Sequence, residues 1–160
     1  MAGTDYFLKL EGIDGESTDD KHKGELDIES FSFGVTQSGS HGTGGGGGAG
    51  KSSFQDLHFS THANKSSPKL FLACATGEHI KKATLTVRKA GKEQQEYYKV
   101  TLSDVLVSSY QAGGSGSPIP TDQFSLNFAK IEYEYKPQKA DGTLDAAVKA
   151  GYDVAANKKV

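Results

Sequence analysis

The sequence has one cysteine, no long apolar run and no excess of charge of either sign. Because Cys74 has no second cysteine to pair with, an intrachain disulfide is excluded and the fold does not require an oxidising compartment. The apolar runs are far shorter than the ~18 residues of a membrane-spanning helix, so we expect no membrane insertion. Residues 1–5 lack a basic region followed by an apolar run and a cleavage site. We therefore expect a protein made and folded in the cytoplasm, whose export would proceed without a cleaved signal peptide.

The charge and the length of the chain exclude further classes of protein. The 160 residues include 20 acidic and 18 basic side chains, which gives a net charge of −2. A nucleic-acid-binding protein normally has a basic excess or a basic face, so we expect no nucleic-acid partner. A chain of this length buries roughly 70% of its unfolded surface, which is enough for a core without disulfides. We expect a single domain spanning residues 1–160.

Alternation of apolar and polar residues predicts a fold that is mainly β. In the segment 25–37, the apolar residues before Glu29 and those after it, through Val35, have opposite parity. A single inserted residue near Glu29–Ser30, a β-bulge, would bring both sets to the core. Short strands separated by turns are typical of a sandwich or a barrel. The predicted strands are 6–13, 25–37, 54–63, 78–89, 98–102, 105–107 and 121–135, and the C-terminal tail is a candidate for a short last strand.

One short helix is predicted over residues 66–76. Ser67 suits the N-cap position, Pro68 suits the first helical position and Gly77 suits the stop. One apolar face follows at helical spacing and consists of Leu70, Phe71, Cys74 and Ala75. Cys74 is therefore interpreted as a small core residue rather than a nucleophile.

Residues 38–51, with the sequence SGSHGTGGGGGAGK, contain no side chain able to bury much apolar area. The segment 45–52 matches the phosphate-loop pattern G-x-x-x-x-G-K-[ST], in which backbone amides hold phosphates and a helix follows directly. The residues that follow here, 54–62, alternate as a strand, so we disfavour a nucleotide site. A glycine loop that packs flat against another subunit is the better interpretation, because glycine allows close backbone approach and positive φ.

Other side chains with catalytic or metal-binding chemistry show no diagnostic spacing. His58 and His62 share a strand face, but four residues along a strand place them too far apart for one metal ion. The sequence has no G-x-S-x-G elbow, no H-E-x-x-H motif and no convincing carboxylate pair. We therefore expect no enzymatic activity, no metal and no cofactor.

Several short stretches are informative through their order and spacing rather than individually. They run from the first strand to about residue 142 and comprise Gly15-Glu16-Ser17 with His22, Gln37-Ser38-Gly39-Ser40, the run 45–51 followed by Gln55-Asp56-Leu57, Val87-Arg88-Lys89-Ala90-Gly91, the run 104–109, Gly113-Gly114-Ser115-Gly116, Leu126-Asn127-Phe128-Ala129 and Tyr135-Lys136-Pro137-Gln138. In this order the chain resembles the haemolysin-coregulated protein (Hcp) family of bacterial type VI secretion systems. It departs at Phe31 and Phe33, where family members often carry tryptophan. Residues 143–160 match less clearly, and their role is open.

The resemblance implies a fold, an assembly and partners. The fold is a β-barrel of two antiparallel sheets with one short flanking α-helix. The assembly is a homohexameric ring with a central pore, and rings stack into a tube inside a contractile sheath on a baseplate, capped by a VgrG spike. Some members hold small effector proteins in the pore. Such a protein is cytoplasmic when assembled and is secreted through the type VI system.

Two groups of residues are candidates for these roles. The loop 38–51 has the length and glycine content to reach a neighbouring ring and flatten against it. Its predicted ring-stacking residues are Ser38, Gly39, Ser40, His41, Gly42, Gly44, Gly45, Gly46, Gly47, Gly48, Gly50 and Lys51. Ser30 and Ser32 alternate away from Phe31 and Phe33 and are candidates for the wall of the pore, which should carry small and polar side chains.

Three other interpretations are open at this point. A small-molecule or carbohydrate-binding β-barrel would need exposed aromatic platforms, and the residues that could supply one are Tyr97, Tyr98, Tyr110, Tyr133 and Tyr135. A phosphate-loop nucleotidase would depend on Lys51. A member of the family fused to a toxin would need a further domain, and the chain ends soon after the predicted barrel.

Overall fold

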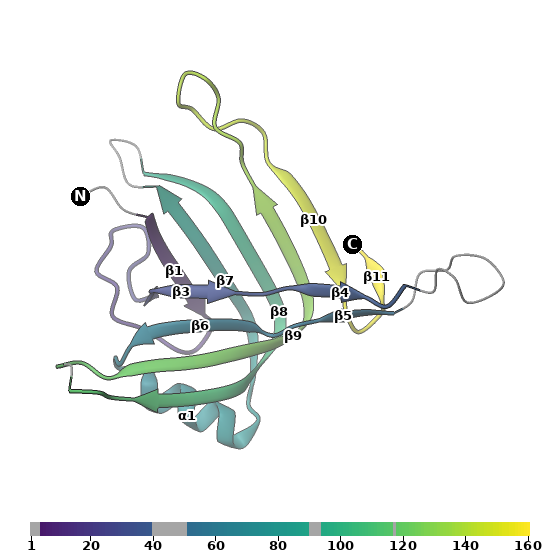
Figure 1. Ribbon diagram of the computed structural model, residues 1–160. Coiled ribbons are helices and arrows are strands. Elements are labelled where there is room, and N and C mark those ends of the chain that lie inside the picture. The colour runs from purple at the N-terminus through teal and green to yellow at the C-terminus, as the bar shows by residue number, and fades with distance from the viewer. Residues whose placement is uncertain (1–3, 40–50, 90–93, 117) are drawn as a thin grey trace.

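The computed structural model describes residues 4–39, 51–89, 94–116 and 118–160, and within these ranges the chain folds mainly as β-strands with one helix (Figure 1). The mainly β prediction with one short helix is confirmed. No helix in the described ranges has the length and apolar character needed to cross a membrane. The elements are β1 (Thr4–Leu10), β2 (Leu26–Ile28), β3 (Ser30–Ser32), β4 (Val35–Gln37), β5 (Ser52–Phe54), β6 (Leu57–His62), α1 (Ser67–Thr76), β7 (His79–Lys89), β8 (Gln95–Gly113), β9 (Thr121–Tyr135), β10 (Val148–Asp153) and β11 (Lys158–Lys159).

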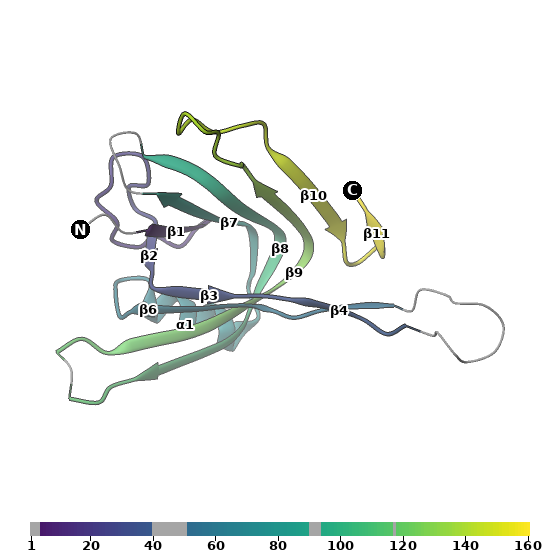
Figure 2. The ribbon, with the colours of Figure 1, turned by 45° about the horizontal axis from the view of Figure 1, so that its top comes forward.

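The strands form one large antiparallel sheet and one small one. The large sheet has the order β11-β10-β9-β8-β7-β1-β2, and β6 joins it by pairing with both β9 and β3. One residue separates β2 from β3, so the hydrogen-bonded pairs and this covalent link together connect β1, β2, β3, β6, β9, β8 and β7 in a circuit. The second sheet consists of β4 and β5, which leave the body as a two-stranded arm (Figure 2).

The irregularity predicted near Glu29–Ser30 is present as a break between two strands. Glu29 belongs to neither β2 nor β3, and its N–H donates to the Ser60 carbonyl at 2.9 Å. Before the break Leu26 is fully buried, and after it Phe31 packs against the same core. The chain therefore changes its partner from β1 to β6 while its apolar side chains stay on the inner face.

The core lies inside the circuit and is covered on one flank by α1. Each fully buried aliphatic or aromatic side chain stabilises the fold by about 1.5–3 kcal/mol relative to an exposed one. The largest buried apolar side chains alternate along the strands, as expected for strands with one inner face, and Leu70 of α1 joins them from the flank. They are Leu8, Leu26, Leu57, Leu70, Leu85, Leu102, Leu126, Val100, Val105, Val107 and Phe124.

Both ends of α1 lie close to the predicted positions, and only the N-cap is shifted, by one residue. Its N-cap is Ser66, one residue before the predicted Ser67, and the Ser67 hydroxyl instead donates a hydrogen bond to the carboxylate of Asp122. Gly77 ends the helix as predicted. It has a φ of 71°, and its N–H donates to the Ala73 carbonyl at 3.0 Å. Glycine is favoured there because a side chain is strained in this left-handed region.

The predicted apolar face of α1 is wrong in part. The buried stripe runs through Leu70 and Ala73, whereas Phe71 is 60% exposed and Ala75 is exposed. Adjacent helical residues point about 100° apart, so a helix lying on a sheet at Leu70 turns Phe71 toward solvent. Cys74, predicted as a core residue, is half-buried against the edge of the core.

Two predicted strands prove to be one, and the strand predicted as a candidate in the C-terminal tail is present. The stretches 98–102 and 105–107 belong to one strand, β8, which passes through Asp104 at a φ of 52°. Residues 143–160 add β10 and β11 to the large sheet, with Val148 opposite Tyr135 at one end of the β10–β9 pairing. The C-terminal tail is therefore an extension of the sheet.

An aromatic seam joins the β3 side of the circuit to the β8–β9 side. Phe31 lies 5.4 Å from Tyr6 and 5.7 Å from Tyr98 between ring centroids, and Tyr133 lies 5.1 Å from Tyr98 and 5.3 Å from Phe33. Burial raises the pKa of Tyr98, and its hydrogen bond to Tyr133 raises it further. Edge-to-face contacts of this kind add to the area that the rings bury.

Residues 12–25 pack back onto the barrel through their own backbone. The Gly15 N–H donates to the Gly24 carbonyl at 2.8 Å, and the Ser17 N–H donates to the Glu25 carbonyl at 3.0 Å. A Cβ placed on Gly15 would lie 2.6 Å from the Glu25 carbonyl oxygen and 2.8 Å from the Leu26 Cα. Since both neighbours are backbone atoms, residue 15 must be glycine for this approach.

We expect Gly15→Ala to lower the free energy of unfolding by about 2 kcal/mol, because overpacking against fixed atoms costs this order of free energy. The measurement is urea unfolding followed by circular dichroism. Gly113→Ala is the matched control, since a Cβ at Gly113 meets no atom within 4 Å. Equal stability of the two variants would show that the loop moves aside without cost.

Candidate assembly surface

The arm formed by β4 and β5 is exposed along β4 and partly exposed along β5. Thr36 pairs with Ser53 and Gln37 pairs with Ser52, and beyond them the Ser38 hydroxyl donates to the Lys51 carbonyl at 3.4 Å. Figures 1 and 2 both show the arm projecting from the barrel. The apolar side chains that follow Glu29, up to and including Val35, were predicted to reach the core. This prediction is wrong for Val35. Val35 is 57% exposed because the chain has already left the barrel.

The predicted stacking loop continues the arm but is described only at its two ends. Ser38, Gly39 and Lys51 are exposed at the far end of the paired strands. Lys51 runs directly into β5 rather than into a helix, so the structural context that a phosphate loop needs is missing from these residues. The remaining predicted stacking residues lie outside the described ranges: Ser40, His41, Gly42, Gly44, Gly45, Gly46, Gly47, Gly48 and Gly50.

Ser30 and Ser32 lie on an outward polar face of the sheet that contains β3, β6, β9 and β8. Both side chains are exposed, and the Ser30 hydroxyl lies 2.5 Å from that of Ser60. His58 is opposite Ser32 in the β3–β6 register. The polar residues that line this shallow groove carry hydroxyl, amide and imidazole groups: Ser30, Ser32, His58, Ser60, Ser109, Gln111 and Gln123. Four aromatic residues line it with them: Phe31, Phe59, Tyr110 and Phe124. Sequence reasoning found two of the polar residues, because the others lie on strands whose register the sequence does not specify.

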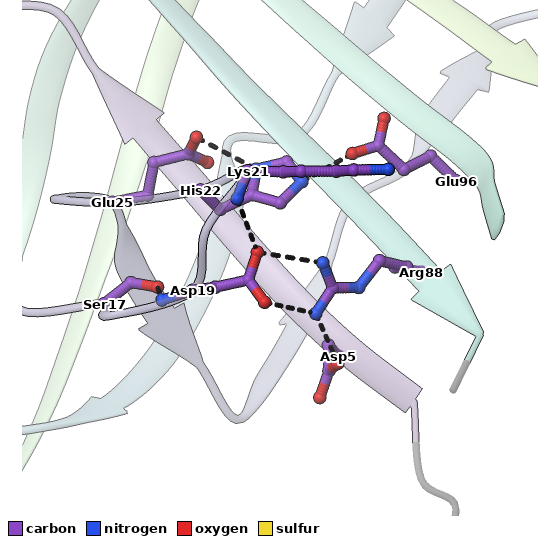
Figure 3. Close-up of polar contacts among 8 residues, drawn as sticks. All are labelled: Asp5, Ser17, Asp19, Lys21, His22, Glu25, Arg88 and Glu96. Carbon is purple, nitrogen blue, oxygen red and sulfur yellow. Dashed lines mark hydrogen bonds and ion pairs between the residues drawn. The ribbon is translucent and has the colours of Figure 1, made fainter. Parts of the chain in front are cut away.

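A charged cluster at the other end of the barrel was not predicted. It joins residues 12–25 to β1, β7 and β8 and consists of Asp5, Asp19, His22, Glu25, Arg88 and Glu96 (Figure 3). Arg88 is 2% exposed, and its guanidinium donates to both oxygens of Asp19 at 2.8 and 2.9 Å and to Asp5 at 3.0 Å. This forked geometry is the strong form of an ion pair.

His22 makes the second half of the charged cluster. Its Nδ1 lies 2.9 Å from Glu25 Oε2 and its Nε2 lies 2.5 Å from Glu96 Oε1. The His22 ring stacks on the Phe7 ring with 4.3 Å between their centroids. The Arg88 guanidinium carbon lies 4.8 Å from the centroid of the Phe7 ring.

The charges of the cluster perturb one another. The hydrogen bonds from Arg88 hold the pKa of Asp19 at about 2, below its ordinary value of 3.8. The same bonds, with Asp5, raise the pKa of Arg88 further above its ordinary value. Each charged group of the cluster is paired with another. We therefore interpret the cluster as a clamp that holds residues 12–25 on the barrel rather than as a reactive centre. Across the described ranges, no three His, Cys, Asp or Glu side chains are grouped so as to hold a metal ion.

Comparison with known proteins finds relatives of this chain in both sequence and structure. The model of a family described as "Type VI secretion system effector, Hcp" matches residues 7–135. The chain is 48% identical over 156 residues to the Hcp1 protein of Pseudomonas aeruginosa, covering 96% of each chain. It superposes on the crystal structure of Hcp1 from Salmonella typhimurium with a TM-score of 0.80 at 35% identity, covering 99% of this chain and 100% of that one. It superposes on a type six secretion system protein with a TM-score of 0.92 at 28% identity, over the same shares of the two chains.

We expect Arg88→Met to lower the free energy of unfolding by about 3 kcal/mol at pH 7, because it leaves partly buried carboxylates without their cation. The pKa of Asp19 is lower in the folded than in the unfolded chain, so its ionisation favours folding above pH 3.8, and this stabilisation is lost as the pH falls toward 2. The difference between wild type and variant should therefore shrink over that range in urea unfolding. Lys9→Met, on an exposed side chain of β1, is the control. A difference unchanged between pH 7 and pH 2 would contradict the clamp.

Proposed function

The chain belongs to the Hcp family of type VI secretion system proteins, and we propose that its role there is structural, as the subunit of hexameric rings that stack into the secretion tube. The observation that carries the proposal is the superposition at a TM-score of 0.92 over 99% of the chain. A likeness that covers the whole barrel, the arm and the tail favours a common role for all three.

The ring is supported by the open edges of the large sheet. Within the described residues, β3 pairs along one edge with β6, and β11 ends the sheet beyond β10. Exposed strand edges favour pairing with another chain, and a closed ring satisfies them without unlimited growth in its plane. We propose six copies in the ring, following the resemblance stated above.

The stacking of rings is assigned to the arm and the loop that continues it. The described part of the arm is exposed along β4, and it carries small or polar side chains apart from Val35 and the half-buried Phe54 at its root. It projects from the barrel, so it can contact a second ring without disturbing the core (Figure 2). The residues 38–51 keep their predicted role as the ring-stacking loop.

The polar face of β3, β6, β9 and β8 is the proposed wall of the pore, with Ser30 and Ser32 on it. Its hydroxyl, amide and imidazole groups can bond to a polar protein surface without holding it as firmly as an apolar wall would. Small effector proteins are the proposed cargo. The VgrG spike, the contractile sheath and the baseplate are the other proposed partners, and export through the same system without a cleaved signal peptide is the proposed localisation.

The carbohydrate-binding alternative gains no support from the tyrosines. Tyr97 meets Tyr135 at an interplanar angle of 83° and Tyr133 meets Tyr98 at 63°, so the rings pack edge to face. A sugar platform needs ring faces presented together to solvent. Tyr133 and Tyr135 are 39% and 43% exposed, but the steep angles to Tyr98 and Tyr97 leave no flat surface shared by two rings. Tyr110 donates its hydroxyl to Asp122 inside the fold.

We expect light scattering after size exclusion to give a mass of about 102 kDa, which is six copies of the 17.0 kDa chain. The measurement should be made at several concentrations, since a ring held by specific contacts keeps its mass on dilution. A monomer of 17.0 kDa at every concentration would count against the ring.

We expect Ser32→Gln to reduce the retention of a cargo effector by rings, because a longer side chain at the pore wall displaces cargo from its hydrogen-bonding groups. The measurement is co-purification of effector with tagged rings. Lys149→Gln, an exposed change on β10, is the control. Unchanged retention in rings of unchanged mass would show that Ser32 does not face the cargo.

A further inference from the structure

We propose that Asp56 and the C-terminal strand β10, through Tyr152, brace the root of the arm and fix the direction in which it leaves the barrel. The inference rests on the proposed role of the arm in ring stacking. It assigns a role to residues 143–160, and it names positioning residues that lie on the barrel rather than on the stacking loop.

The need for a brace follows from how the arm is attached. Strands β4 and β5 form their own sheet, and no ladder of hydrogen bonds in the described ranges joins them to the large sheet. At the root, the Gln55 N–H donates to the Gly34 carbonyl at 2.9 Å, which closes the ribbon but does not orient it. A two-stranded ribbon is marginally stable alone, so its direction depends on contacts with the body.

The first such contact is polar and is made by Asp56, between β5 and β6. Its Oδ2 accepts a hydrogen bond from the Ser108 hydroxyl at 2.6 Å, and its Oδ1 accepts one from the Asn127 amide at 2.9 Å. Ser108 lies where the β8–β9 register shifts, between Val107 and Ser109, and such a bulge re-aims the side chain that it carries. One carboxylate thereby ties the root of the arm to two strands of the large sheet.

The second contact is aromatic and is made by Phe54, the last residue of β5. Its ring lies 6.1 Å from Phe128 on β9 and 5.2 Å from Tyr152 on β10. Tyr152 is held by its pairing with Ile131 and by its hydroxyl, which donates to Asn157 at 2.6 Å. Strand β10 therefore presents a ring that packs against Phe54.

The two contacts hold the segment 54–56 from β8, β9 and β10. Because they come from different strands, they fix the direction in which the arm leaves the barrel. A stacking element held in its bound orientation loses less conformational freedom on contact, and this preorganisation strengthens association. Removal of either contact should leave the barrel and the ring intact and make the arm mobile. The loss should appear in stacking and not in ring formation.

The test uses the full chain with a nitroxide label at residue 51, introduced as Lys51→Cys in a Cys74→Ala background. Label mobility in isolated rings is recorded by electron spin resonance, and the yield of stacked tubes is measured by sedimentation and electron microscopy. The perturbing variants are Asp56→Ala and Tyr152→Ala. Tyr152→Phe keeps the ring beside Phe54 and removes only the hydroxyl bond to Asn157, so its label should be less mobile than that of Tyr152→Ala. Asp14→Ala, at an exposed carboxylate on the 12–25 loop, is the matched control.

We expect both alanine variants to show a mobile label and a tube yield about tenfold lower than wild type at unchanged ring mass. Should Asp56→Ala fail to fold, the double variant Ser108→Ala with Asn127→Ala removes the same bonds and keeps the carboxylate. An immobile label in these variants would overturn the brace, as would a mobile label with normal stacking. Wild-type rings that never stack would overturn the proposed function instead, while label mobility would still decide whether the brace exists.

Discussion

The barrel, the arm and the polar face all depend on the crossing that the chain makes at Glu29. Here the backbone leaves β1 and joins β6, and two hydrogen bonds hold the crossing in place. The Glu29 N–H donates to the Ser60 carbonyl at 2.9 Å, and the Thr61 hydroxyl donates to the Asp27 carbonyl at 2.6 Å. Without this change of partner the circuit of strands would stay open. Ser30 would then not face Ser60, and the arm would not emerge beside β6.

Much of the fold could be predicted because its signals are local. Alternation located the long strands, and the change of parity in residues 25–37 located the crossing at Glu29. Gly77 marked the end of the helix because a left-handed residue is a local requirement. The prediction was wrong at Phe71 and Val35, which are apolar but exposed. Whether an apolar residue is buried depends on what lies opposite it, and the sequence alone does not state this.

The candidate site was less predictable because its contacts join distant parts of the chain. Arg88 bonds to Asp19 and Asp5 across 69 and 83 residues, and Asp56 bonds to Ser108 across 52. No spacing rule covers such separations, and each residue alone reads as an ordinary surface charge. The exposed placement of Ser30 and Ser32, away from the core, could be predicted because strand parity is local. Their neighbours His58 and Ser60 required the β3–β6 register.

The pairing of β1 with β7 also has a consequence for how the chain folds. Thr4 lies opposite Lys89, and Leu57 on β6 lies opposite Leu126 on β9, so the circuit cannot close until most of the chain has been synthesised. Proteins dominated by such distant pairings fold slowly, typically over milliseconds to seconds, because a long loop must close before its contacts form. Until then the edges of β6 and β7 are unpaired and prone to aggregate. Pairing of copies into the proposed ring therefore has to wait for this closure, and the slow closure of the circuit sets the earliest moment at which two copies can present their folded surfaces to one another.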